Sequence, residues 1–88
     1  MKDLLLQTFM EKIAPLIFQE NHRQLEKWGV QDHDAFQWLT FTMEELGELA
    51  EAISDWYFRD GTSEAVVEEA IQTATLSLKI AEMFKEEI

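Results

Sequence analysis

The sequence predicts an all-α fold, in which an antiparallel helical hairpin follows an N-terminal helix. Three observations favour this fold. Apolar residues recur at the i, i+3, i+4 spacing of one helix face in several long stretches, and short polar connectors separate these stretches. No stretch shows the apolar–polar alternation of a half-buried strand. A chain of 88 residues is also the size of one domain, which we expect to span residues 1–88.

The N-terminal helix is expected over residues 3 to about 26. Pro15 should divide or kink it, because proline has no backbone N–H and disfavours helical backbone in the residue before it. Gly29 suits the C-terminus of this helix. Asp32 or Asp34 then suits the N-cap of the next helix, because a short acidic side chain accepts a hydrogen bond from the free N–H groups there.

Two longer helices are expected over residues 35–58 and over residues 64 to about 87. In the connector, Gly61 suits the residue after a helix, and Thr62 or Ser63 suits the next N-cap. A link this short makes the second helix run back along the first. The sequence therefore predicts an antiparallel hairpin for the C-terminal part of the chain.

The apolar content is high for so short a chain. Hydrophobic residues make up 47% of the sequence, with three Trp and six Phe. The apolar arcs on the two long helices are wider than a single neighbouring helix can cover. We therefore expect a homodimer or homotetramer with a helical-bundle interface.

The charge balance excludes several classes of partner. Lys and Arg number 7 against 18 Asp and Glu, which gives a net charge of −11. A nucleic-acid polymer and an anionic membrane both need a basic surface, so neither is expected as a partner. There is no cysteine for a disulfide or a thiolate zinc site. No apolar run approaches the length of a membrane span, and the opening residues are too short and polar for a signal peptide, so we expect a soluble cytoplasmic protein.

Three glutamates occupy unusual positions on the two long helices. On a helical wheel, Glu45 falls inside the apolar arc of its helix and Glu48 falls on the edge, whereas Glu44 points to the other side. Glu69 falls among the apolar residues of the last helix. Burying an unpaired carboxylate costs several kcal/mol, and the chain has few cations to pair with these groups. A hard divalent cation between the two helices would resolve the conflict.

Two segments of the chain carry a family resemblance. The motif Glu-Glu-x-x-Glu at residues 44–48, followed on the next helix by Glu69, looks like the metal-binding signature of the MazG-type, all-α nucleoside triphosphate pyrophosphohydrolases. Upstream, Arg-Gln-Leu-Glu-Lys-Trp-Gly-Val-Gln-Asp-His at residues 23–33 resembles a segment of the small phage- and mobile-element-type members. Together the similar segments cover residues 23 to about 80, which is most of the chain.

The resemblance implies an enzyme that cleaves a nucleoside triphosphate between the α- and β-phosphates, giving the monophosphate and pyrophosphate. It implies metal ligation by Glu44, Glu45, Glu48, Glu69 and Gln72. It makes Glu45 and Glu48 catalytic, and it favours nucleotide binding by Arg23, Lys27 and Trp28. The usual family pattern has Asp where this sequence has Gln72. An amide offers a neutral carbonyl oxygen in place of a carboxylate, so Mg²⁺ affinity should be lower.

Structural interpretations compete with these assignments. Arg23 and Lys27 could pair with Glu20 or Glu26 rather than with phosphates, and Trp28 could be a packing aromatic. For the whole chain, three interpretations stay open. The first is the pyrophosphohydrolase, the second is a catalytically degenerate relative that binds nucleotide or protein, and the third is a structural acidic helical oligomer.

Overall fold

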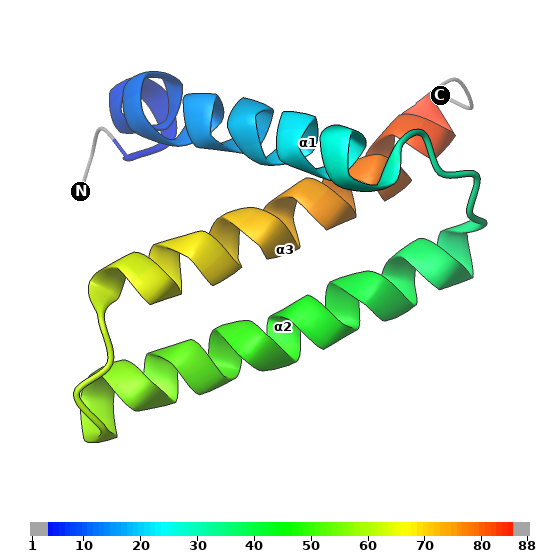
Figure 1. Cartoon of the computed structure of the whole chain (residues 1–88). Coiled ribbons are helices and arrows are strands. Elements are labelled where there is room, and N and C mark those ends of the chain that lie inside the picture. The colour runs from blue at the N-terminus through cyan, green and yellow to red at the C-terminus, as the bar shows by residue number, and fades with distance from the viewer. Residues whose placement is uncertain (1–3, 86–88) are drawn as a thin grey trace. The chain divides into compact units, whose positions relative to one another are not determined.

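The structure is a computed structural model that describes residues 4–85, with side chains described from residue 7 onwards. The chain forms two compact units, Met1–Gln31 and Asp32–Ile88. The elements over residues 4–85 follow in the order η1, α1, α2 and α3 (Figure 1), all of them helical. The all-α prediction is therefore confirmed for the described residues, and the single domain over residues 1–88 stays a prediction.

The first unit contains two consecutive helical elements. The π-helix η1 (Leu4–Ile13) continues directly into the α-helix α1 (Ala14–Trp28). Pro15 lies in the first turn of α1, directly after the junction with η1. The predicted division at Pro15 thus coincides with the change from π-helical to α-helical backbone. Gly29 ends α1 with a positive φ of 73°, and its N–H donates to the Leu25 carbonyl oxygen at 2.8 Å.

The second unit is the antiparallel hairpin that the sequence predicts. Its helices α2 (Ala35–Phe58) and α3 (Ser63–Phe84) lie side by side and run in opposite directions (Figure 1). The bounds of α2 and the start of α3 agree with the prediction to within one residue. The predicted end of the last helix, near residue 87, lies outside the described residues.

Side-chain caps fix where both hairpin helices begin. The Asp34 carboxylate accepts a hydrogen bond from the Gln37 backbone N–H at 2.8 Å. In return, the Gln37 side-chain oxygen accepts from the Asp34 N–H at 2.9 Å, which completes a capping box. At the start of α3, the Thr62 hydroxyl accepts from the Ala65 N–H at 3.1 Å. Asp34 and Thr62 are therefore the N-caps among the alternatives that the sequence offers.

The connector of the hairpin depends on a close approach of backbone to backbone. The residue with a positive φ is Asp60, at 59°, and not the glycine that follows it. The Gly61 N–H donates to the Asp55 carbonyl oxygen at 2.8 Å. A Cβ atom on Gly61 would lie 2.7 Å from Asp55 Cβ and 2.8 Å from the Asp55 carbonyl carbon. Glycine is thus required here because there is no room for a side chain.

The hairpin leaves much of its apolar surface exposed. Among its described residues, the buried ones are Ala52, Ile71 and Thr75. The exposed large apolar residues of α2 and α3 are Phe36, Leu39, Met43, Leu46, Ile53, Trp56, Tyr57, Phe58, Val67, Leu78, Met83 and Phe84. Despite this apolar character, no helix in the described part of the chain carries an apolar run that could span a bilayer.

Candidate metal centre

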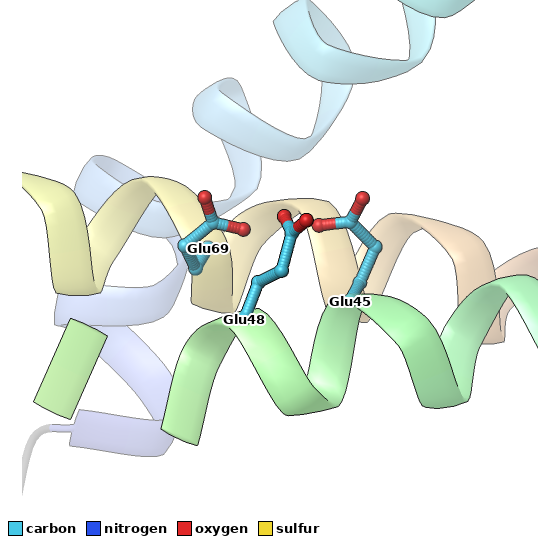
Figure 2. A group of neighbouring side chains, drawn as sticks. All are labelled: Glu45, Glu48 and Glu69. Atoms are coloured by element: carbon cyan, nitrogen blue, oxygen red, sulfur yellow. The ribbon is translucent and has the colours of Figure 1, made fainter. Parts of the chain in front are cut away.

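The hairpin brings together the three glutamates that helical spacing singles out. Glu45 and Glu48 lie one turn apart on α2, and Glu69 lies on the neighbouring α3. One carboxylate oxygen from each lies within 4.8 Å of the others. Figure 2 shows the Glu45 and Glu48 carboxylates on the same side of α2, with the Glu69 carboxylate reaching the same region from α3. We call Glu45, Glu48 and Glu69 the carboxylate cluster.

The exposure of the three cluster side chains agrees with their predicted positions relative to the apolar arcs of their helices. Glu45 and Glu69, which fall inside the apolar arcs, are half-buried, whereas Glu48 at the edge of its arc is exposed. Three negative charges this close repel one another, and partial burial strengthens the repulsion because it lowers the local dielectric. Hydrogen-bond donors or a cation would offset that repulsion.

Gln72 lies against the carboxylate cluster. It follows Glu69 by one turn of α3, so both side chains leave the helix on the same face. With its amide nitrogen turned toward the cluster, Gln72 donates to Glu45 Oε2 at 3.0 Å and to Glu69 Oε2 at 3.2 Å. The residue that the resemblance places among the metal ligands is therefore in direct contact with two of the other proposed ligands.

Glu44 is the one proposed metal ligand that stands apart. Its side chain is exposed, as its wheel position predicts, and it does not belong to the carboxylate cluster. Helical geometry accounts for this, because adjacent residues point about 100° apart around the axis. With Glu45 in the cluster beside Glu69 of α3, Glu44 points to a different side of α2.

Two acidic residues near the cluster were not predicted from the sequence. A pocket of about 260 Å³ between α2 and the start of α3 is lined by Glu48 and Glu69 and also by Glu51 and Asp55. The Asp55 carboxylate accepts a hydrogen bond from Arg59 at 2.6 Å. The spacing of Glu48, Glu51 and Asp55 at i, i+3 and i+7 places them on one helix face, and this is the signal that could have revealed them.

In the first unit, Arg23 pairs with an acidic residue of its own helix. Its guanidinium donates to both oxygens of Glu20, at 2.9 Å and 2.7 Å, and Gln24 donates to Glu20 Oε2 at 2.7 Å. The hydrogen bond from Arg23 is the main cause that lowers the pKa of Glu20, against the opposing effect of burial. Of the two interpretations of Arg23, pairing with Glu20 is thus present in the structure.

Lys27 and Trp28 form a cation–π contact at the end of α1. The Lys27 Nζ lies 4.6 Å from the centroid of the Trp28 ring, and the Arg23 Cζ lies 5.8 Å from it. Half of the Trp28 surface is exposed. Glu26, the other acidic residue considered as a partner, contacts His22 at 2.9 Å. The three residues assigned to nucleotide binding are therefore neighbours on one part of α1.

Comparison of the chain with protein-family models, with curated proteins and with solved structures finds no match. The features of the chain that point to a function are therefore its sequence motifs and the geometry of the carboxylate cluster.

Proposed function

We propose that this protein is a Mg²⁺- or Mn²⁺-dependent nucleoside triphosphate pyrophosphohydrolase of the MazG type. It would hydrolyse a (d)NTP with one water molecule to the nucleoside monophosphate and pyrophosphate. The observation that carries the proposal is the convergence of Glu45, Glu48 and Glu69 from two antiparallel helices, with oxygens within 4.8 Å of one another. The MazG-like spacing of the motif at residues 44–48 and the second helix supports the same activity.

The donor set fits a hard divalent cation. Mg²⁺ and Mn²⁺ prefer carboxylate and carbonyl oxygens, and the cluster offers three carboxylates with the Gln72 amide beside them. Glu45, Glu48 and Glu69 would hold the ion, and Gln72 would add its carbonyl oxygen. The chemistry that the ion supplies is neutralisation of phosphate charge and activation of water for attack on phosphorus. Glu44 is exposed and lies outside the carboxylate cluster, so its role as a ligand is the least supported of the proposed set.

Residues of the chain are also assigned to catalysis and to nucleotide binding. Glu45 and Glu48 are the carboxylates we assign to catalysis, because they lie one turn apart and point the same way. The net charge of −11 repels a triphosphate, so substrate approach depends on the bound cation and on basic groups. Arg23, Lys27 and Trp28, which lie together on α1, are the residues we assign to nucleotide binding.

The activity is tested by incubating the purified protein with a panel of canonical and modified (d)NTPs and Mg²⁺ or Mn²⁺. The expected products are the monophosphate and pyrophosphate in equal amounts, resolved by anion-exchange chromatography. Release of orthophosphate and a nucleoside diphosphate would indicate cleavage between the β- and γ-phosphates, which is a different reaction. If no nucleotide is cleaved in either metal, the proposed enzyme activity is wrong.

One observation favours a second function, that of a nucleotide- or protein-binding helical module without turnover. The Gln72 amide, which stands where the family usually has Asp, donates to two of the three cluster carboxylates and so partly satisfies them without a cation. Nucleotide binding without pyrophosphate release would support this alternative. Recovery of pyrophosphate release in Gln72→Asp would support it further.

We also propose that the protein is a homodimer or homotetramer. The exposed apolar residues on α2 and α3 support it, because large exposed apolar patches commonly mark protein interaction surfaces. Light scattering after gel filtration at micromolar concentration should give two or four times the subunit mass of 10.3 kDa. Leu46→Lys, in the apolar surface, should shift the mass down, whereas Glu68→Lys on the exposed polar side of α3 should not. A wild-type mass of one subunit would contradict the proposal.

Binding of the metal should stabilise the fold. Millimolar Mg²⁺ or Mn²⁺ should raise the melting temperature by several degrees, since a ligand at about 100 times its Kd adds about 2.7 kcal/mol to the free energy of unfolding. Glu48→Gln should lose most of this increase. Glu68→Gln removes the same charge outside the cluster and should keep it. An unchanged melting temperature in the wild-type protein would show that the carboxylate cluster is not a metal site.

A further inference from the structure

The side-chain amide of Gln72 lies where two of the cluster carboxylates approach each other. The terminal amide atom that faces the two carboxylates is 3.0 Å from Glu45 Oε2, on α2, and 3.2 Å from Glu69 Oε2, on α3. The two ends of an amide have nearly the same shape, but the nitrogen carries two donors and the oxygen only accepts. The orientation of this one group therefore decides whether it attracts or repels both carboxylates.

The two orientations suit two different conditions. With the nitrogen toward the carboxylates, one amide makes a charge-assisted hydrogen bond to each helix and links α2 to α3. With the carbonyl toward them, only acceptor oxygens face one another, which is unfavourable unless a cation lies among them. The terminal torsion of Gln is broad and roughly two-fold, so the amide can turn without any movement of the helix.

We infer that Gln72 is a positioning residue that reverses its amide when the metal binds. Without metal, its nitrogen donates to Glu45 and Glu69 and holds the two carboxylates together. With metal, its carbonyl oxygen faces the ion. This inference rests on the metal site of the proposed function. An ionised Asp at the same position could only accept hydrogen bonds, so it would bind metal more tightly but repel Glu45 and Glu69 when the metal is absent.

The donor role is tested without metal or nucleotide. In EDTA, Gln72→Met keeps a helix-forming side chain of similar length and should lower the melting temperature by about 5 °C or more, as expected for losing hydrogen bonds to two charged groups in a small domain. Gln72→Glu should lower it further in EDTA, and it should gain more from Mn²⁺ than the wild-type protein does. If Gln72→Met melts like the wild-type protein in EDTA, the inference is wrong.

A double-mutant cycle separates this role from simple packing. In the Glu69→Gln background, one of the two hydrogen-bond acceptors is no longer charged. The fall in melting temperature that Gln72→Met causes in EDTA should therefore be about half as large as in the wild-type background. An equal loss in both backgrounds would show that Gln72 contributes only packing, and it would overturn the inference.

The reversal itself has a spectroscopic signature. The side-chain NH₂ signal of Gln72, assigned by its absence in Gln72→Met, should shift on titration with Mg²⁺ and should exchange faster with solvent once its two hydrogen bonds are broken. A signal that stays fixed at Mg²⁺ concentrations that raise the melting temperature would overturn the reversal. If Mg²⁺ leaves the melting temperature unchanged, the proposed metal site fails, whereas the EDTA measurements still report the donor role of the amide.

Discussion

Replacing Glu48 by Gln should lower kcat for pyrophosphate release by on the order of a hundredfold or more. Glu48 is the exposed member of the carboxylate cluster, so its substitution removes a charged ligand with little effect on the packing of the hairpin. The amide has the same shape as the carboxylate but binds a divalent cation far less well. Initial rates at saturating nucleotide and Mn²⁺ provide the measurement.

Two controls make the result specific. Glu68→Gln removes an equal charge from an exposed site outside the cluster, and it should keep kcat within about twofold of the wild-type value because exposed charges interact weakly. The melting temperature of Glu48→Gln in EDTA should not fall below that of the wild-type protein. A Glu48→Gln variant with full activity would remove Glu48 from the catalytic assignment.

Replacing Gly61 by Ala should destabilise the protein by about 2 kcal/mol, a cost typical of overpacking. The added Cβ would meet the Cβ and the carbonyl carbon of Asp55 at 2.7 and 2.8 Å. Because one of these atoms belongs to the backbone, the clash cannot be relieved by turning a side chain. The Gly61–Asp55 hydrogen bond of 2.8 Å would lengthen as the connector opens. In thermal unfolding, the melting temperature should fall by about 10 °C.

Gly47 provides a matched control for this substitution. It lies within α2 and is exposed, and apart from its chain neighbours and the nearby backbone of its own helix no atom lies within 4 Å of the position that a Cβ would occupy. Gly47→Ala should therefore stabilise the protein by about 0.5–1 kcal/mol, because alanine loses less backbone entropy in a helix. If Gly61→Ala melts at or above the wild-type temperature, the close approach at Gly61 does not limit stability.

The hairpin could be predicted from the sequence because local signals agree with one another. The apolar period marks both helices, and a short polar connector with glycine leaves only an antiparallel arrangement. Given that arrangement, the convergence of Glu45, Glu48 and Glu69 follows from their positions on the wheel. These features depend on helix geometry, which is the same in every sequence.

Other features could not be predicted because they depend on the path of the backbone. The sequence offers two candidates for each N-cap, and the choice of Asp34 and Thr62 depends on where the chain enters each helix. The sequence correctly marks Gly61 as a connector residue. The reason glycine is needed there is its close approach to Asp55, and the left-handed backbone is adopted by Asp60 instead. The π-helical backbone of η1 has no sequence signal that distinguishes it from an α-helix.

The tight connector at residues 59–62 also restricts how the length of this chain can change. Because the connector anchors the start of α3 against α2, the number of residues from Ser63 to Glu69 fixes the direction in which Glu69 points. One residue inserted in that segment would turn Glu69 by about 100° and move it by about 1.5 Å along the axis, away from Glu45 and Glu48. An insertion beyond Gln72 would leave the cluster in place. Homologues with the same chemistry should therefore keep the number of residues from Ser63 to Glu69 and can vary in length beyond Gln72.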